Sequence, residues 1–111
     1  MKITDLLNKK SIAINPKVTS KEGAIDKLVD LMNLSGNLNN KEEYKKAVLA
    51  REELSTTGIG DGIAIPHAKT SAVKDAGLAA MVVNDGVDYD SLDGQPAKLF
   101  FMIAAPDGEN N

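Results

Sequence analysis

The sequence predicts an α/β fold in which a mixed sheet packs against helices. Two segments carry apolar residues at helical spacing, and they lie between a short alternating segment near the N-terminus and three later apolar segments. The resulting order of strand, helix, helix, strand, strand, strand is typical of a sheet layered with helices. The length of 111 residues and the 42% hydrophobic content fit one folded domain covering residues 1–111.

The first strand and the first helix follow each other directly. Residues 11–14 alternate in polarity and stop at an Asn-Pro pair, as a strand does before a turn. Thr19 and Glu22 have the spacing of a capping box, which predicts the start of a helix. Gly36 predicts its end nearby. The apolar face of this helix consists of Ile25, Leu28, Val29 and Met32.

The second predicted helix begins at Asn40, with Glu43 three residues later. Its apolar stripe consists of Tyr44, Ala47, Val48 and Leu54. Arg51 lies on the same face or at its edge, because it follows Val48 by three residues and Ala47 by four. We therefore expect the Arg51 guanidinium to be partly buried or aimed into a cleft.

The segment after this helix is expected to be mostly loop. Serine, threonine and glycine dominate residues 55–62, and such a composition predicts an irregular backbone. Strand character returns at residues 63–65 and is cut by Pro66, because proline cannot continue a ladder of hydrogen bonds. A second loop is expected at residues 68–77.

Two apolar runs, residues 78–83 and 99–104, are suited to strands that are covered on both faces. Asp-Gly pairs at 85–86 and 93–94 predict turns on either side of a short segment at 87–89. Two helices are a thin supply for both faces of such a sheet. Either another copy of the chain covers the second face, or a following helix is missing from this chain.

Composition excludes several classes of function. With a net charge of −3, the chain lacks the excess of basic residues that is typical of nucleic-acid-binding proteins. The absence of cysteine excludes disulfides, thiolate metal sites and thiol catalysis, and a single histidine cannot supply a zinc site, so we expect no metal. The two glycine-rich motifs typical of nucleotide sites, G-x-G-x-x-G and G-x-x-x-x-G-K-[ST], do not occur in the sequence.

Charge and hydropathy also give expectations about the surface and the compartment. Adjacent glutamates at 42–43 and 52–53 point in different directions on a helix, so they are interpreted mainly as surface charges. The sequence shows no signal-peptide pattern and no apolar run of the ~20 residues that cross a bilayer. We therefore expect a cytoplasmic protein.

His67 is the only histidine and the main candidate for chemistry. A period-two pattern places it on the face of Ile63 and Ile65, which favours a packed core residue. Pro66 opposes that interpretation, because it ends the ladder at a strand end, where α/β folds commonly bind ligands. A neutral imidazole, with an ordinary pKa of ~6.5, is a nitrogen nucleophile near pH 7 and can attack phosphorus.

A phosphorylated histidine needs positive charge and hydrogen-bond donors around the phosphate oxygens. The available donors are Arg51, Lys69, the hydroxyls of Thr56, Thr57 and Thr70, and loop amides. Arg51 is the better cation because its planar fork matches phosphate oxygens in pairs, whereas Lys69 is a point charge. The alternatives are an ion pair of Arg51 with Glu43 or another acid, and a solvated position for Lys69.

A family resemblance rests on residues 49–70 (LAREELSTTGIGDGIAIPHAKT), residues 88–111 (DYDSLDGQPAKLFFMIAAPDGENN) and the opening MKITDLL. Together they resemble the enzyme IIA domains of the fructose/mannitol class in the bacterial phosphoenolpyruvate-dependent sugar phosphotransferase system. The residues around His67, with Ala-Lys-Thr after it and the later Asp-Gly-Gln-Pro turn, are more similar to the fructose-specific branch than to the mannitol or nitrogen-regulatory branches.

The resemblance implies a phosphotransferase with no cofactor. His67 accepts a phosphoryl group from the phosphorylated carrier protein HPr and passes it to a cysteine of enzyme IIB. From there the group reaches fructose or a related sugar crossing the membrane through enzyme IIC. The family's active-site arginine falls on Arg51, and we expect Thr57, Thr70 and Lys69 to help bind the phosphate. The implied fold is a mixed sheet of about five strands flanked by helices.

The sequence departs from the family at its C-terminal end. Members usually continue past the Ala-Pro-Asp-Gly-Glu-Asn-Asn segment with a further histidine and a helical part, whereas this chain stops at Asn111. The resemblance therefore implies a C-terminally truncated domain, whose exposed apolar surface favours homo-oligomers. Two alternatives stay open: a nitrogen-regulatory enzyme IIA that controls another protein without sugar transport, and a fragment that keeps only the scaffold.

Overall fold

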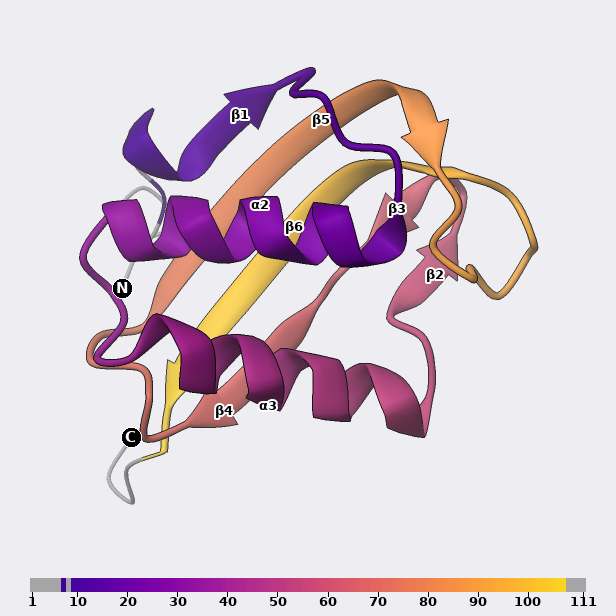
Figure 1. Ribbon diagram of the computed structural model, residues 1–111. Helices are drawn as coiled ribbons and strands as arrows, with labels where there is room; N and C mark the ends of the chain where they lie inside the picture. Colours follow the sequence, from indigo (N-terminus) through magenta and orange to yellow (C-terminus); the bar gives the residue numbers. More distant parts are fainter. Residues whose placement is uncertain (1–6, 8, 108–111) are drawn as a thin grey trace.

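The computed structural model describes residue 7 and residues 9–107, which form a mixed sheet with two helices on one face (Figure 1). The helices are α2 (Lys21–Leu34) and α3 (Lys41–Leu54). The strands among these residues are β1 (Ile12–Ile14), β2 (Gly58–Gly60), β3 (Ile63–Ala64), β4 (His67–Thr70), β5 (Gly77–Val87) and β6 (Ala97–Pro106), and the 3-10 helix η1 (Lys9–Ser11) precedes them. The predicted α/β class with a mixed sheet is confirmed.

The centre of the sheet is the antiparallel pair of β5 and β6. β1 lies parallel to β5 on one side. On the other side of β6, β3 and β4 run parallel to it one after the other, with Ile63 opposite Leu99 and His67 opposite Ile103. β2 pairs antiparallel with β3. The described residues form six strands rather than about five, because residues 58–70 pair in three short pieces.

Both helices begin at a polar residue whose side chain caps the first turn. Asn40 accepts a hydrogen bond from the Glu43 backbone N–H at 3.0 Å, which confirms the predicted start of α3. The predicted cap of α2 is wrong by one residue. Ser20, not Thr19, precedes this helix in an extended conformation, and its Oγ accepts the Gly23 N–H at 3.0 Å.

Helix α3 packs on the sheet through Tyr44 and Val48, which are fully buried. The Tyr44 hydroxyl donates a 2.9 Å hydrogen bond to the Ile103 carbonyl of β6 and so joins the helix to this strand. Glu52 occupies the next buried position on this face. Leu54, predicted to belong to the apolar stripe, is instead 81% exposed, because it ends the helix at the rim of an open pocket.

Strands occupy parts of both predicted loops. β2 lies within residues 55–62, because β3 gives this glycine-rich segment a partner. β4 occupies the start of residues 68–77. Pro66 interrupts the strand without ending the pairing, since its carbonyl accepts the Ile103 N–H at 3.0 Å and the chain continues along β6.

The two Asp-Gly pairs differ in their outcome. The pair at 85–86 lies inside β5, where Gly86 has a φ of 81° and the register with β6 shifts, so it forms a bulge rather than the predicted turn. The pair at 93–94 forms the predicted turn, with a φ of 74° at Gly94. Between them Tyr89 is completely buried.

The two faces of the sheet differ in their cover. Figure 1 shows α2 and α3 side by side across the same face, and buried and more exposed residues alternate along β5 and β6. On the opposite face Ile14 is 73% exposed and Phe101 is 37% exposed. The described residues therefore do not provide the expected cover on both faces. Neither α2 nor α3 is long and apolar enough to span a membrane.

Candidate functional site

His67 lies at the break between β3 and β4, on the side of β6 away from β5. Its ring is half-buried, and its Nδ1 lies 2.8 Å from the Ile65 carbonyl oxygen. A carbonyl oxygen can only accept a hydrogen bond, so this contact places the proton of the neutral ring on Nδ1. The lone pair is then on Nε2.

The imidazole lines a pocket between α3 and β4 with a volume of about 510 Å³. The lining residues are Ala47, Ala50, Arg51, Leu54, His67, Ala68 and Lys69. Apolar side chains form much of the wall, and the imidazole and two cationic side chains provide the polar groups. Such a combination suits a small anionic group, because charge interactions strengthen next to apolar surface.

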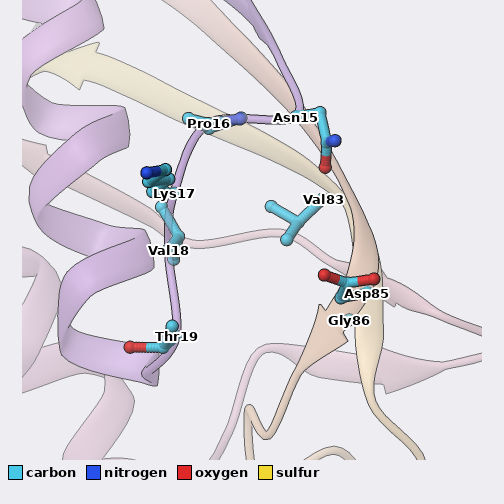
Figure 2. Close-up of a pocket in the computed structure, with 8 residues that line it drawn as sticks. All are labelled: Asn15, Pro16, Lys17, Val18, Thr19, Val83, Asp85 and Gly86. Atoms are coloured by element: carbon cyan, nitrogen blue, oxygen red, sulfur yellow. The ribbon is translucent and has the colours of Figure 1, made fainter.

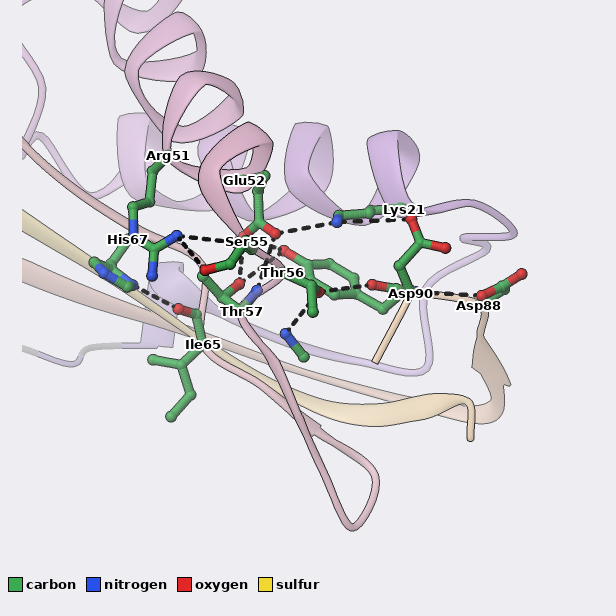
Figure 3. A network of polar contacts seen from close by, with 12 residues as sticks. Lys21, Arg51, Glu52, Ser55, Thr56, Thr57, Ile65, His67, Asp88 and Asp90 are labelled. Carbon is green, nitrogen blue, oxygen red and sulfur yellow. Dashed lines mark hydrogen bonds and ion pairs between the residues drawn. The ribbon is translucent and has the colours of Figure 1, made fainter. Parts of the chain in front are cut away.

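Arg51 comes from the last turn of α3 and shares this pocket with His67 (Figure 3). Its Nη1 donates to the Ser55 carbonyl at 2.9 Å, which holds the guanidinium at the end of the helix. Within the described residues no carboxylate lies within ion-pair distance of Arg51. The alternative of an ion pair with Glu43 is therefore not what the structure shows, and N–H donors remain available to an anion.

The structure brings Arg51 and Lys69 to the pocket of His67, but not the threonines. Lys69 is exposed on the pocket wall. The Thr57 hydroxyl is buried and donates to the Glu52 carboxylate. The Thr70 hydroxyl accepts the Ala72 N–H at 3.2 Å. Contact of the two threonine hydroxyls with a phosphate stays a prediction.

The sequence does not predict the burial of Glu52, which lies next to Arg51 in α3. Its side chain is 5% exposed, although the 52–53 pair is predicted to be on the surface. Its carboxylate accepts the Thr57 N–H at 3.1 Å, the Thr57 hydroxyl and the Tyr89 hydroxyl at 3.0 Å, and it pairs with the Lys21 ammonium at 3.1 Å. The sequence contains one signal of this burial. Tyr44, Val48 and Glu52 follow one another at intervals of four residues, so they lie on the same face of α3.

The electrostatics of this network keep Glu52 ionised. Burial by itself raises the pKa of Glu52, but the hydrogen bonds from Thr57, Lys21 and Tyr89 outweigh burial and hold the pKa below its ordinary value. Burial raises the pKa of Tyr89, so the phenol remains a donor. The Lys21 ammonium also lies 4.7 Å from the centre of the Tyr89 ring. We call these four residues, Lys21, Glu52, Thr57 and Tyr89, the Glu52 network.

A second pocket of about 510 Å³ lies between the β1–α2 connection and β5 (Figure 2). Its lining residues are Asn15, Pro16, Lys17, Val18, Thr19, Val83, Asp85 and Gly86. This pocket contains one cation and one carboxylate and no nucleophilic imidazole. Nowhere in the described ranges do three potential metal ligands cluster. The pocket of His67 is therefore the candidate site.

Comparison with known proteins identifies the family of the chain. Residues 5–111 match the family described as "Phosphoenolpyruvate-dependent sugar phosphotransferase system, EIIA 2". The whole chain is 54% identical to part of the fructose-specific EIIABC component of the phosphotransferase system in Bacillus subtilis. The match covers 18% of that protein, so the chain spans a small part of this relative's length.

Two solved structures share the fold. Nitrogen regulatory protein IIA-Ntr from Neisseria meningitidis is 30% identical and has a TM-score of 0.85, over 94% of this chain and 70% of that one. Mannitol enzyme IIA from Escherichia coli, solved in complex with phosphorylated mannitol enzyme IIB, is 28% identical and has a TM-score of 0.80. That match covers 93% of this chain and 72% of the other.

Proposed function

Because the chain belongs to the EIIA 2 family of the phosphoenolpyruvate-dependent sugar phosphotransferase system, we propose that it is a phosphotransferase that carries a phosphoryl group on His67. The observation that carries this proposal is the shared pocket of His67 and Arg51, in which an imidazole nucleophile lies beside a guanidinium without a carboxylate partner among the described residues. The donor is phosphorylated HPr, and the acceptor is a cysteine of enzyme IIB.

The reacting atom is Nε2. Its lone pair attacks the phosphorus, a new P–N bond forms, and the bond between the phosphorus and HPr breaks. Nδ1 keeps its proton throughout, and the Ile65 carbonyl stabilises the positive charge that the ring gains by accepting this proton in a hydrogen bond. In the next step the cysteine thiolate attacks the same phosphorus, and the Nε2–P bond breaks as an S–P bond forms.

Arg51 and Lys69 stabilise the charge on the transferred group. Phosphoryl transfer depends mainly on positioning and on positive charge around the equatorial oxygens. Arg51, on α3, supplies paired N–H donors. Lys69, on β4, adds a second cation from the other side of the pocket.

Enzyme IIB and HPr are the proposed partners, and membrane enzyme IIC is an indirect one. The relative solved as a complex with phosphorylated enzyme IIB supports the first of these. Leu54, 81% exposed at the rim of the pocket, offers apolar contact area to a docked protein. The fructose-specific relative supports fructose as the sugar, and the family membership supports a cytoplasmic location.

The experiment that tests this function uses phosphoenolpyruvate, enzyme I and HPr. The chain should take up one phosphate that is labile in acid and stable in base, and His67→Ala should abolish the label. Persistence of the label in folded His67→Ala protein overturns the assignment. A wild-type chain that takes no label contradicts the carrier function and favours the scaffold fragment.

A nitrogen-regulatory role is the second candidate, because IIA-Ntr shares 30% identity and the fold. The two roles differ in the next acceptor. Transfer of the label from His67 to a fructose-specific enzyme IIB supports sugar uptake. A stable label that is not passed to enzyme IIB, together with phosphorylation-dependent binding of another protein, supports regulation.

A further inference from the structure

The Glu52 network reaches the candidate nucleophile through hydrogen bonds of the backbone. Figure 3 shows the first and the last of these contacts, between Glu52 and Thr57 and between Ile65 and His67. Glu52 holds Thr57 by both its N–H and its hydroxyl. The Thr57 carbonyl accepts the Ile65 N–H at 3.0 Å, and the Ile65 carbonyl lies 2.8 Å from Nδ1 of His67. Three successive contacts therefore connect a buried carboxylate to the imidazole.

We propose that Glu52 is a positioning residue for the phosphoryl transfer, which fixes the Ile65 carbonyl through Thr57 and thereby sets the orientation and tautomer of the His67 ring. This inference rests on the proposed function of His67. Glu52 does not touch the reacting atoms and acts only through these residues.

The same short segment also holds the cation. Arg51 precedes Glu52 in α3, and its Nη1 donates to the Ser55 carbonyl, two residues before Thr57. The turn at residues 55–57 thus contacts Arg51, which lines the pocket, at one end and Glu52 at the other. A displacement of this turn moves the guanidinium relative to the imidazole, and misplacement by about 1 Å can slow catalysis roughly 100-fold.

A carboxylate suits this position better than an amide. Donors converge on Glu52 from Thr57, Tyr89 and Lys21, and a carboxylate is an acceptor at both oxygens. The NH₂ group of a glutamine would face one of these donors. Because Lys21 lies on α2 and Tyr89 follows β5, the network also ties the turn to two distant elements.

The test compares Glu52→Gln with Glu53→Gln, a matched control at an exposed neighbouring position. We expect Glu52→Gln to slow transfer from phosphorylated HPr by about tenfold or more, and Glu53→Gln to leave it unchanged. The readout that distinguishes positioning from stability is the imidazole ¹⁵N spectrum of the unphosphorylated chain, which contains one histidine. Wild type should show Nδ1 protonated and Nε2 bare, and Glu52→Gln should show a mixture of the two tautomers.

Each outcome decides between the interpretations. A folded Glu52→Gln protein with the wild-type tautomer, whether its transfer is slow or not, overturns the inference and leaves Glu52 a role in stability alone. If Glu52→Gln does not fold, the test uses Tyr89→Phe, which removes only one donor to Glu52. Transfer should then slow and the second tautomer should appear, both to a smaller extent than expected for Glu52→Gln. Unchanged readouts in folded Tyr89→Phe overturn the inference.

Failure of the proposed function gives a different result. In that case wild type takes no label, while the ¹⁵N spectrum still reports whether Glu52 sets the ring tautomer. The two proposals therefore fail separately.

Discussion

Arg51 and Glu52 are neighbours in α3, yet they lie in opposite kinds of environment. The Glu52 carboxylate is almost completely buried and bound by donors from three other residues. The Arg51 guanidinium is half-buried and, among the described residues, makes hydrogen bonds only to Ser55. The charge of Glu52, whose hydrogen bonds are satisfied, therefore holds the turn at 55–57, whereas the charge of Arg51 in the pocket has N–H donors available for an anion.

The largest effect is expected for the removal of the buried carboxylate. Glu52→Ala should lower the free energy of unfolding by about 3 kcal/mol, because it leaves Lys21 and buried hydroxyls without their acceptor. Urea unfolding followed by circular dichroism measures this change. Glu53→Ala is the control and should stay within about 0.5 kcal/mol of wild type. An equal loss in both variants would contradict the contrast between the neighbours.

Arg51→Gln should slow phosphoryl transfer and leave the stability of the fold almost unchanged. Transfer from phosphorylated HPr should fall roughly 100-fold, because a charged donor next to the phosphoryl group is lost. The free energy of unfolding should change by less than about 0.5 kcal/mol, since within the described part of the chain Arg51 bonds only to the adjacent turn. Rapid-quench labelling and urea unfolding check the two statements. A destabilised protein with normal transfer would show that Arg51 has a structural role instead.

Tyr89→Phe tests the phenol hydroxyl of the Glu52 network. It removes the 3.0 Å hydrogen bond to Glu52 and the 3.3 Å contact with the Thr57 hydroxyl, and it keeps the edge-to-face contact with Phe100. We expect a loss of about 1 kcal/mol in the free energy of unfolding, the usual value for one hydrogen bond. Thermal unfolding measures it. A loss as large as that of Glu52→Ala would mean that the phenol, and not the carboxylate, organises the network.

Acid should weaken the network. The pKa of Glu52 in the folded chain lies below its ordinary value of 4.5, so its stabilising contribution is complete above that pH and is lost as the pH falls through the folded pKa. Wild type should therefore lose more stability below about pH 4.5 than Glu52→Gln, which has no group to protonate. Urea unfolding at a series of pH values measures the difference. Parallel pH profiles for the two proteins would contradict it.

Lys69→Met should have the smallest effect. Its side chain is an exposed point charge at the pocket wall, so we expect transfer to slow by about threefold or less, with unchanged stability. Labelling kinetics at low and moderate salt measure this, because salt screens an exposed charge. A loss as large as that of Arg51→Gln would make Lys69 a main ligand of the phosphate.

Local signals in the sequence predict much of the fold. Apolar residues at helical spacing define both helices, and the Asn40 cap is confirmed. Apart from the α2 cap, which is Ser20 rather than Thr19, the main errors occur where a tertiary partner decides. β2 forms in a glycine-rich segment because β3 lies beside it, and β4 forms after Pro66 because β6 continues past that point.

The candidate site, like the fold, is predicted only in part from local signals in the sequence. The helical position of Arg51 predicts that it faces a cleft, and the structure places it in the pocket of His67. The burial of Glu52 is not predicted, because a charged residue is ordinarily exposed unless it has partners. Those partners, Lys21 and Tyr89, lie 31 and 37 positions away in the sequence.

Residue types, periodicity and a long matching segment are enough to predict the family, the fold class and the candidate nucleophile His67. The free ring nitrogen of His67 and the identity of the buried carboxylate become evident only in the folded chain. Protonation and burial depend on the groups that folding brings within hydrogen-bond distance, and most of those groups come from other elements of the chain.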